Sequence, residues 1–170
     1  VAPLINRQKG QSVLIDAAKI LKNKIPELLV VFVGAGDDIV LLRRHAKDMP
    51  NVKFIGFKRN YVDYIKAFDV FAYPANTESS AGILLDVMEQ GVPIVASNVG
   101  GIPDLIEDGK NGFLIEPGDA ESLADYILTL KKDRELYYSF VSNGRNEAEL
   151  HSSAAMAAEY YRNYFSIIHS

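Results

Sequence analysis

The protein is an acidic chain of 170 residues with a formal net charge of −4. Hydrophobic residues make up 48% and charged residues 24% of the sequence, which is typical of a globular domain and excludes a disordered or coiled-coil chain. The sequence has no cysteine, which excludes disulfide scaffolds, cysteine-based zinc sites and thiol nucleophiles and makes the cytoplasm the expected compartment. An acidic sequence without a basic tract also argues against a nucleic-acid partner.

The length predicts a single domain over residues 1–170. No apolar run approaches the ~20 residues that a membrane span needs, and the sequence does not open on a signal peptide. The opening residues, Val1-Ala2-Pro3-Leu4-Ile5, resemble the end of a strand. We therefore expect the chain to be a piece of a longer protein.

Short apolar runs predict a buried parallel sheet, because they are apolar on both faces and most of them end at glycine or proline. These runs are residues 28–33, 52–55, 70–73, 93–96 and 112–115. Together with the strand end at residues 1–5, they predict about six strands.

Segments with helical periodicity alternate with these strands. They cover residues 14–21, 40–44, 61–68, 83–90, 119–130, 135–149 and 152–168. Pro26 is expected to stop the first, Gly91 to close the fourth, and Asp119 to cap the fifth. The alternation predicts a doubly wound α/β sheet with helices on both faces and a helical C-terminal tail.

The helical tail either covers the sheet or forms a strap to a second domain. It carries aromatic residues at helical spacing, Tyr160, Tyr161, Tyr164 and Phe165. We interpret these as packing residues of the last helix.

Ligands bind beyond the carboxyl ends of the strands in open parallel sheets, so polar groups that follow strands are the candidate site residues. The first such group is Gly34-Ala35-Gly36-Asp37-Asp38-Ile39, which begins like a dinucleotide fingerprint. The third glycine is missing and no acidic residue follows at the spacing that a ribose contact needs. We interpret this group as a tight turn between a strand and a helix.

The second group is Asn6-Arg7-Gln8-Lys9-Gly10, between the first strand and the first helix. Arg7, Lys9 and the backbone amides of a helix start could bind an anion. The spacing of a P-loop is absent. An exposed basic turn is the alternative interpretation.

The third group is the segment 74–86, where a polar loop with small residues opens an apolar helix. Free amides of Ser80, Ala81, Gly82 and Ile83 could hold phosphate oxygens. Asp86 follows about 7 Å farther along the helix axis, far enough for a ribose, and Glu78 precedes the helix on the sugar side. The alternative is that Glu78 only favours the helix dipole and that Asp86 is a solvated helix residue.

The spacing of Glu78 and Asp86, with seven residues between them, resembles the E-x7-E motif of retaining glycosyltransferases with the GT-B fold, in particular family 4. Further segments resemble family motifs in the same order: Lys9-Gly10, residues 33–36, 51–56, 91–97, 100–104 and 108–114. The resemblance covers nearly the whole chain. It identifies the chain as the C-terminal, donor-binding half of such an enzyme, with a Rossmann-like sheet.

By this resemblance, Lys9 would neutralise the diphosphate of a nucleotide-sugar donor and Glu78 would face hydroxyls of the donor sugar. The amides of residues 81–83 would hold phosphate oxygens, and Asp86 would bind ribose hydroxyls. The backbone of Gly56, Phe57 and Lys58 would lie beside the base of the nucleotide.

The resemblance also implies sugar transfer to a hydroxyl group with retention of configuration, without a metal or other cofactor. The acceptor would bind to an N-terminal domain outside this sequence. Any peripheral contact with a membrane would also come from that domain.

Two residues depart from the family pattern. Asp86 is one methylene shorter than the usual glutamate, and Pro3 stands where many members have arginine, a role that Arg7 could take over. These departures favour one alternative function, a non-catalytic donor-binding or scaffold subunit. A nucleotide-sugar epimerase of the same architecture is the other alternative that stays open. The three histidines, His45, His151 and His169, do not have the spacing of metal ligands.

Overall fold

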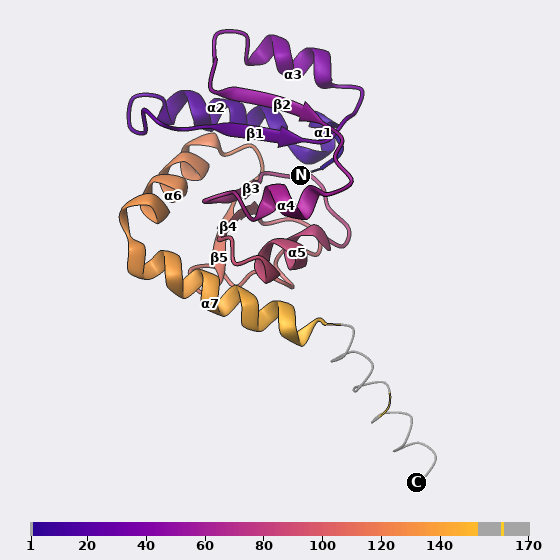
Figure 1. Ribbon diagram of the computed structural model, residues 1–170, viewed down its shortest axis with the longest axis vertical. Helices are drawn as coiled ribbons and strands as arrows, with labels where there is room; N and C mark the ends of the chain where they lie inside the picture. Colours follow the sequence, from indigo (N-terminus) through magenta and orange to yellow (C-terminus); the bar gives the residue numbers. More distant parts are fainter. Residues whose placement is uncertain (1, 153–160, 162–170) are drawn as a thin grey trace.

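The computed structural model describes residues 2–152 and residue 161 (Figure 1). Its helices and strands alternate along most of the chain, which confirms the predicted α/β class. In chain order they are α1 (Asn6–Lys9), α2 (Gln11–Leu21), β1 (Val30–Val33), α3 (Ile39–His45), β2 (Val52–Gly56), α4 (Tyr61–Ile65), β3 (Phe71–Tyr73), α5 (Ile83–Glu89), β4 (Ile94–Ser97), β5 (Gly112–Ile115), α6 (Ala120–Lys132) and α7 (Arg134–Leu150).

The strands form two parallel sheets, where the sequence predicts one. In the first sheet β1 pairs with β2, and Val30 lies opposite Val52. In the second sheet β4 lies between β3 and β5, so that Ile94 has Phe71 on one side and Gly112 on the other. The described residues contain five strands, so the expected number of about six is not confirmed.

Residues 2–5, in the segment where the sequence predicts the first strand, do not form one. The amide of Ala2 donates to the carbonyl oxygen of Val33 and that of Leu4 to Ala35, both at 3.1 Å. Pro3 between them has no N–H to donate, and the chain turns into α1 at Asn6. The segment therefore only touches the end of β1 and does not build a ladder between the sheets.

A cavity of about 800 Å³ lies between β1 of the first sheet and β3 of the second sheet. Val31 and Val33 line it from β1, and Val70 and Ala72 line it from the β3 side. Lys9 lines the same cavity, which therefore extends to the carboxyl ends of the strands.

Helices cover both faces of the second sheet, as predicted, because successive side chains of a strand point to opposite faces. From β4, Ile94 and Ala96 pack with residues of α4 and α5, whereas Val95 packs with α2, α6 and Phe140 of α7. Helix α2 also packs through Ile15 against the first sheet. It is therefore the element that joins the two sheets.

The predicted helix ends are confirmed at two places. The carboxylate of Asp119 accepts from the amide of Ser122 at 2.9 Å and caps α6, and Gly91 after α5 has the left-handed φ of 72°. Helices α6 and α7 form the start of the helical tail and run along one side of the molecule in Figure 1. The predicted helix 152–168, with Tyr160, Tyr164 and Phe165, lies outside the described residues apart from its first residue and Tyr161.

Candidate functional site

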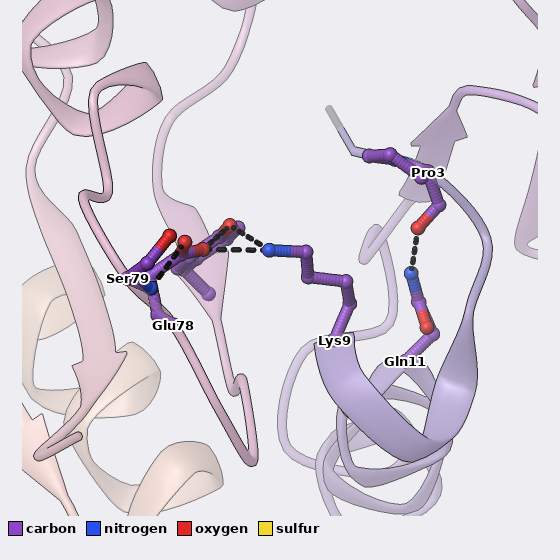
Figure 2. Close-up of polar contacts among 6 residues, drawn as sticks. Pro3, Lys9, Gln11, Glu78 and Ser79 are labelled. Atoms are coloured by element: carbon purple, nitrogen blue, oxygen red, sulfur yellow. Dashed lines mark hydrogen bonds and ion pairs between the residues drawn. The ribbon is translucent and has the colours of Figure 1, made fainter. Parts of the chain in front are cut away.

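Lys9 and Glu78 meet at the carboxyl ends of the strands, 69 residues apart in the sequence. Lys9 is the last residue of α1, and its Nζ lies 2.7 Å from Oε2 of Glu78, in the loop after β3. Figure 2 shows the lysine reaching across to the glutamate. The two side chains are only 17% and 9% exposed, so this ion pair is largely withdrawn from water.

Tyr73 completes this cluster, and sequence reasoning did not single it out. Its hydroxyl donates to Oε2 of Glu78 and accepts from Nζ of Lys9 at 3.2 Å. Tyr73 is the last residue of β3. That position at a strand end was the available signal, because such side chains face the ligand edge of a parallel sheet.

The cluster shifts the pKa values of all three groups. Burial opposes the charge of Glu78, but hydrogen bonds from Lys9, Tyr73 and the Ser79 amide lower its pKa to about 2. Burial opposes the charge of Lys9 as well, but the bonds to Glu78 and Tyr73 raise its pKa. Burial and the bond to Glu78 raise the pKa of Tyr73 to about 12. At neutral pH the cluster is an ion pair with a neutral phenol.

Two glycines allow the backbone to bring the cluster together. A Cβ at Gly10 would lie 1.8 Å from the carbonyl oxygen of Pro74, and one at Gly100 would lie 1.6 Å from that of Glu78. Both glycines have positive φ, 61° and 55°. Any side chain at these two positions would collide with the backbone. Gly10 therefore allows α1 to lie close to the loop after β3, and Gly100 allows its backbone to lie against the loop that contains Glu78.

The loop between β3 and α5 is tied to the first helices. The amides of Asn76 and Thr77 both donate to the carbonyl oxygen of Gln8, at 2.8 and 3.2 Å. Residues Gln8, Lys9, Thr77, Glu78 and Ser79 line a cavity of about 330 Å³ at this junction. The second and third polar groups of the sequence thus meet in one site.

The segment that leads into α5 presents backbone donors. Within residues 2–152, no backbone acceptor is recorded for the amides of Ser80, Ala81 and Gly82, and Ile83 begins the helix. Ala81 is buried and has a φ of 46°, a left-handed conformation that is costly for alanine. The strained residue lies directly before Gly82, which precedes the first residue of α5.

Asp86 lies on α5, and its carboxylate is not simply solvated. Its Oδ2 accepts a hydrogen bond of 2.8 Å from the hydroxyl of Tyr61, the first residue of α4. This bond raises the pKa of Tyr61. No motif in the sequence marked Tyr61, because its role depends on how α4 packs beside α5.

The remaining predicted residues lie at the same edge without a recorded partner for their side chains in the described part of the chain. Arg7 is exposed, and only its backbone oxygen is bonded, by Nδ2 of Asn76 at 3.1 Å. Gly56 ends β2 with a φ of 75°, and the side chain of Phe57 is 71% exposed. Lys58 follows in the same open turn.

The turn at Gly34–Gly36 packs against the chain start. A Cβ would lie 2.0 Å from the carbonyl oxygen of Ala2 at Gly34, and 2.5 Å from that of Leu4 at Gly36. Asp38, which follows this turn, accepts from the amide of Asn6 at 2.7 Å. These contacts agree with the interpretation as a tight turn.

Within residues 2–152 and 161, no group of three histidine, aspartate or glutamate side chains could hold a metal ion. In the same residues, no helix is long and apolar enough to cross a membrane.

Comparison with known proteins assigns the chain to a family. The sequence model of the family described as "Glycosyl transferases group 1" matches residues 3–147. The chain belongs to this family. The predicted resemblance to glycosyltransferases of group 1 is thereby confirmed.

Relatives and solved structures agree with this assignment. The chain is 31% identical over 156 residues to the sulfoquinovosyl transferase SQD2 of Arabidopsis thaliana and 33% identical over 158 residues to the putative glycosyltransferase EpsD of Bacillus subtilis. These matches cover 89% and 91% of the chain, but the chain spans only 31% and 42% of the two relatives.

Among solved structures, the C-terminal domain of the group 1 glycosyl transferase LpcC from Francisella tularensis superposes with a TM-score of 0.78 at 26% identity. That match covers 85% of this chain and 80% of the LpcC domain. Anabaena HepE in complex with UDP gives 0.86 at 27% identity, over 97% of this chain and 47% of HepE.

Proposed function

We propose that this chain binds a nucleoside diphosphate sugar and presents it for transfer to a hydroxyl acceptor, with retention of configuration and without a metal ion. The acceptor site and any contact with a membrane would belong to a further, N-terminal domain. A cytoplasmic location remains a prediction.

The observation that carries this proposal is the convergence of Lys9, Glu78 and the free amides of residues 80–82 at one edge of the sheet. A cation and unpaired amides are the groups that hold a diphosphate without a metal. Asp86 lies farther along α5, on the side where a ribose would follow the phosphates. The UDP complex of the similar HepE supports a nucleotide ligand.

The geometry suggests how the cluster would act on the donor. Lys9 would stabilise the charge that develops on the departing diphosphate, which is the larger part of catalysis in a site that works by positioning and electrostatics. Glu78 has a pKa of about 2, so it stays ionised and can accept hydrogen bonds from sugar hydroxyls. When a diphosphate approaches, it would compete with Glu78 for Lys9.

The proposal is tested by the melting temperature of the chain with UDP, GDP and ADP, each with and without a sugar. A ligand at 100 times its dissociation constant should stabilise the fold by about 2.7 kcal/mol. In Lys9→Ala, binding of the diphosphate should weaken far more than binding of the nucleoside. Lys47→Ala, at an exposed turn after α3, is the matched control and should change neither.

The assignment of Lys9 would be wrong if nucleoside and diphosphate lost affinity equally, or if neither did. If none of the three diphosphates shifted the melting temperature of the wild-type chain, the proposed function itself would be overturned.

A further inference from the structure

The contact between Tyr61 and Asp86 places two oxygen atoms side by side at the candidate nucleotide site. The phenol hydroxyl lies 2.8 Å from Oδ2 of the carboxylate and donates to it. The ring of Tyr61 packs against the core cluster that contains Ile65 and Leu84. Because the ring is anchored in this way, the hydroxyl is held at a fixed place beside Asp86.

The two side chains together still have capacity to accept hydrogen bonds. Oδ2 of Asp86 is engaged by Tyr61, whereas no donor is recorded for Oδ1 among the residues that the structure describes. A phenol oxygen that donates its proton can still accept a hydrogen bond. The pair therefore offers two neighbouring acceptors, one from each residue.

Two adjacent acceptors match the chemistry of a cis-diol. A glutamate could offer both of its oxygens to the 2′ and 3′ hydroxyls of a ribose. Asp86 is one methylene shorter and has already committed one oxygen to Tyr61. The phenol oxygen lies 2.8 Å from Oδ2 of the same carboxylate and could accept from the second hydroxyl.

We infer that Tyr61 is a ribose-binding residue: Asp86 accepts from one ribose hydroxyl and Tyr61 from the other. This rests on the proposed function, because it names how the same site recognises its nucleotide. The position of Tyr61 agrees with it. The residue begins α4 directly after the turn at Gly56–Asn60, which contains the residues expected beside the base, and it touches α5, whose start presents the phosphate-binding amides.

The test compares wild type and Tyr61→Phe with the diphosphate that binds in the panel above and with its 2′-deoxy and 3′-deoxy forms. Loss of one neutral hydrogen bond should weaken the ribonucleotide about three- to tenfold. One of the two deoxy forms lacks the hydroxyl that would donate a hydrogen bond to Tyr61. Wild type and Tyr61→Phe should therefore bind that form with nearly the same affinity.

Tyr64→Phe is the matched control, because Tyr64 lies on the same helix but lines the cavity between the sheets. It should bind all three ligands like wild type. Melting temperatures without ligand show whether each variant folds.

Two results would overturn the inference while leaving the proposed function standing. One is a Tyr61→Phe variant that binds the ribonucleotide as tightly as wild type. The other is an equal loss for the ribonucleotide and both deoxy forms, which would mean that Tyr61 only positions Asp86. Failure of wild type to bind any diphosphate would instead overturn the proposed function, and this inference with it.

Discussion

At the scale of single residues, the site depends on the balance among Lys9, Tyr73 and Glu78. A buried ion pair is costly unless each charge is hydrogen-bonded as well as paired. Here Oε2 of Glu78 accepts hydrogen bonds from both Lys9 and Tyr73, and Oε1 accepts one from the amide of Ser79 at 2.9 Å. Both oxygens of the carboxylate are therefore satisfied, which explains how the pair can persist with little exposure to water.

The Glu78 cluster should make stability depend on acid pH. Its pKa of about 2 lies below the ordinary 4.5, so the carboxylate stabilises the fold fully above pH 4.5. That contribution, up to about 3 kcal/mol, should be lost as the pH falls from about 5 toward 2. The unfolding free energy of wild type should approach that of Glu78→Gln over this range in denaturant titrations.

Glu89→Gln, at an exposed position on α5, is the control for this measurement. Its stability relative to wild type should not change with pH in this range. A constant difference between wild type and Glu78→Gln would contradict the depressed pKa of Glu78.

Gly100 is expected to be the glycine whose substitution affects the site most directly. A methyl group there would meet the carbonyl oxygen of Glu78 at 1.6 Å, at a φ that also disfavours alanine. Overpacking and left-handed strain together should cost about 3 kcal/mol or more in Gly100→Ala and displace Glu78 from Lys9. Chemical denaturation measures the loss.

Gly109→Ala separates the two causes, because Gly109 has a similar φ of 74° but no atom within 4 Å of an added Cβ. It should lose only the strain component, about 1–2 kcal/mol. Equal losses in the two variants would show that the Gly100 contact with the Glu78 loop contributes nothing.

At the scale of elements, local pattern predicted most of the molecule. The five apolar runs became strands, and in the second sheet helices bury both faces. Capping residues such as Asp119 marked helix starts. The split between β1 and β3 could not be predicted, because pairing of edges is a non-local property. Tyr61 escaped prediction for the same reason: its partner Asp86 lies 25 residues away.

The candidate site shows the same division. Lys9, Glu78 and Asp86 were predicted as site residues from spacing and family resemblance. Their partners were not, because Tyr73 and Tyr61 act through contacts that only the packed fold creates. The sequence thus supplied candidate residues, whereas their mutual hydrogen bonds could not be predicted from it.

The separation of the sheets should be visible in amide exchange. Amides along a paired strand point alternately to its two edges. The amides of Val30 and Gly34 donate toward β2, so those of Val31 and Val33 point to the cavity between the sheets. We expect Val31 and Val33 to exchange at least about tenfold faster than Phe32 in NMR exchange experiments.

Val95 in the central strand β4 is the reference for full protection. If Val31 and Val33 were protected as strongly as Phe32 and Val95, the edge of β1 would have to be paired, and the split between the sheets would be contradicted.

At the scale of the whole molecule, the chain spans only part of the length of its relatives. It spans 31% and 42% of the length of the two relatives described above, and 80% of the LpcC domain, which is itself a C-terminal domain. All groups of the candidate site suit a donor: a cation, free amides and a carboxylate for hydroxyls. The proposed function assigns the acceptor to a further domain.

We predict that the isolated chain binds a nucleotide sugar but does not transfer the sugar. Transfer requires donor and acceptor to be held in reactive geometry, an effect of about 7–11 kcal/mol at its upper range, and the proposed site would hold only the donor. The candidate site also opens at an exposed edge, beside residues such as Arg7 and Phe57. Water can therefore reach the anomeric carbon, so the expected chemistry is at most slow hydrolysis of the donor.

The measurement is the release of free sugar and of glycosylated product from the bound nucleotide sugar, with glycerol and simple sugars as added acceptors. A nucleotide-dependent rise in melting temperature without glycosylated product is the expected result. Glu78→Gln serves as the matched variant, because any hydrolysis that depends on the site should fall with it. Transfer at the roughly 1–1,000 turnovers per second of ordinary enzymes would show that one domain suffices, since only a site that also holds the acceptor reaches such rates.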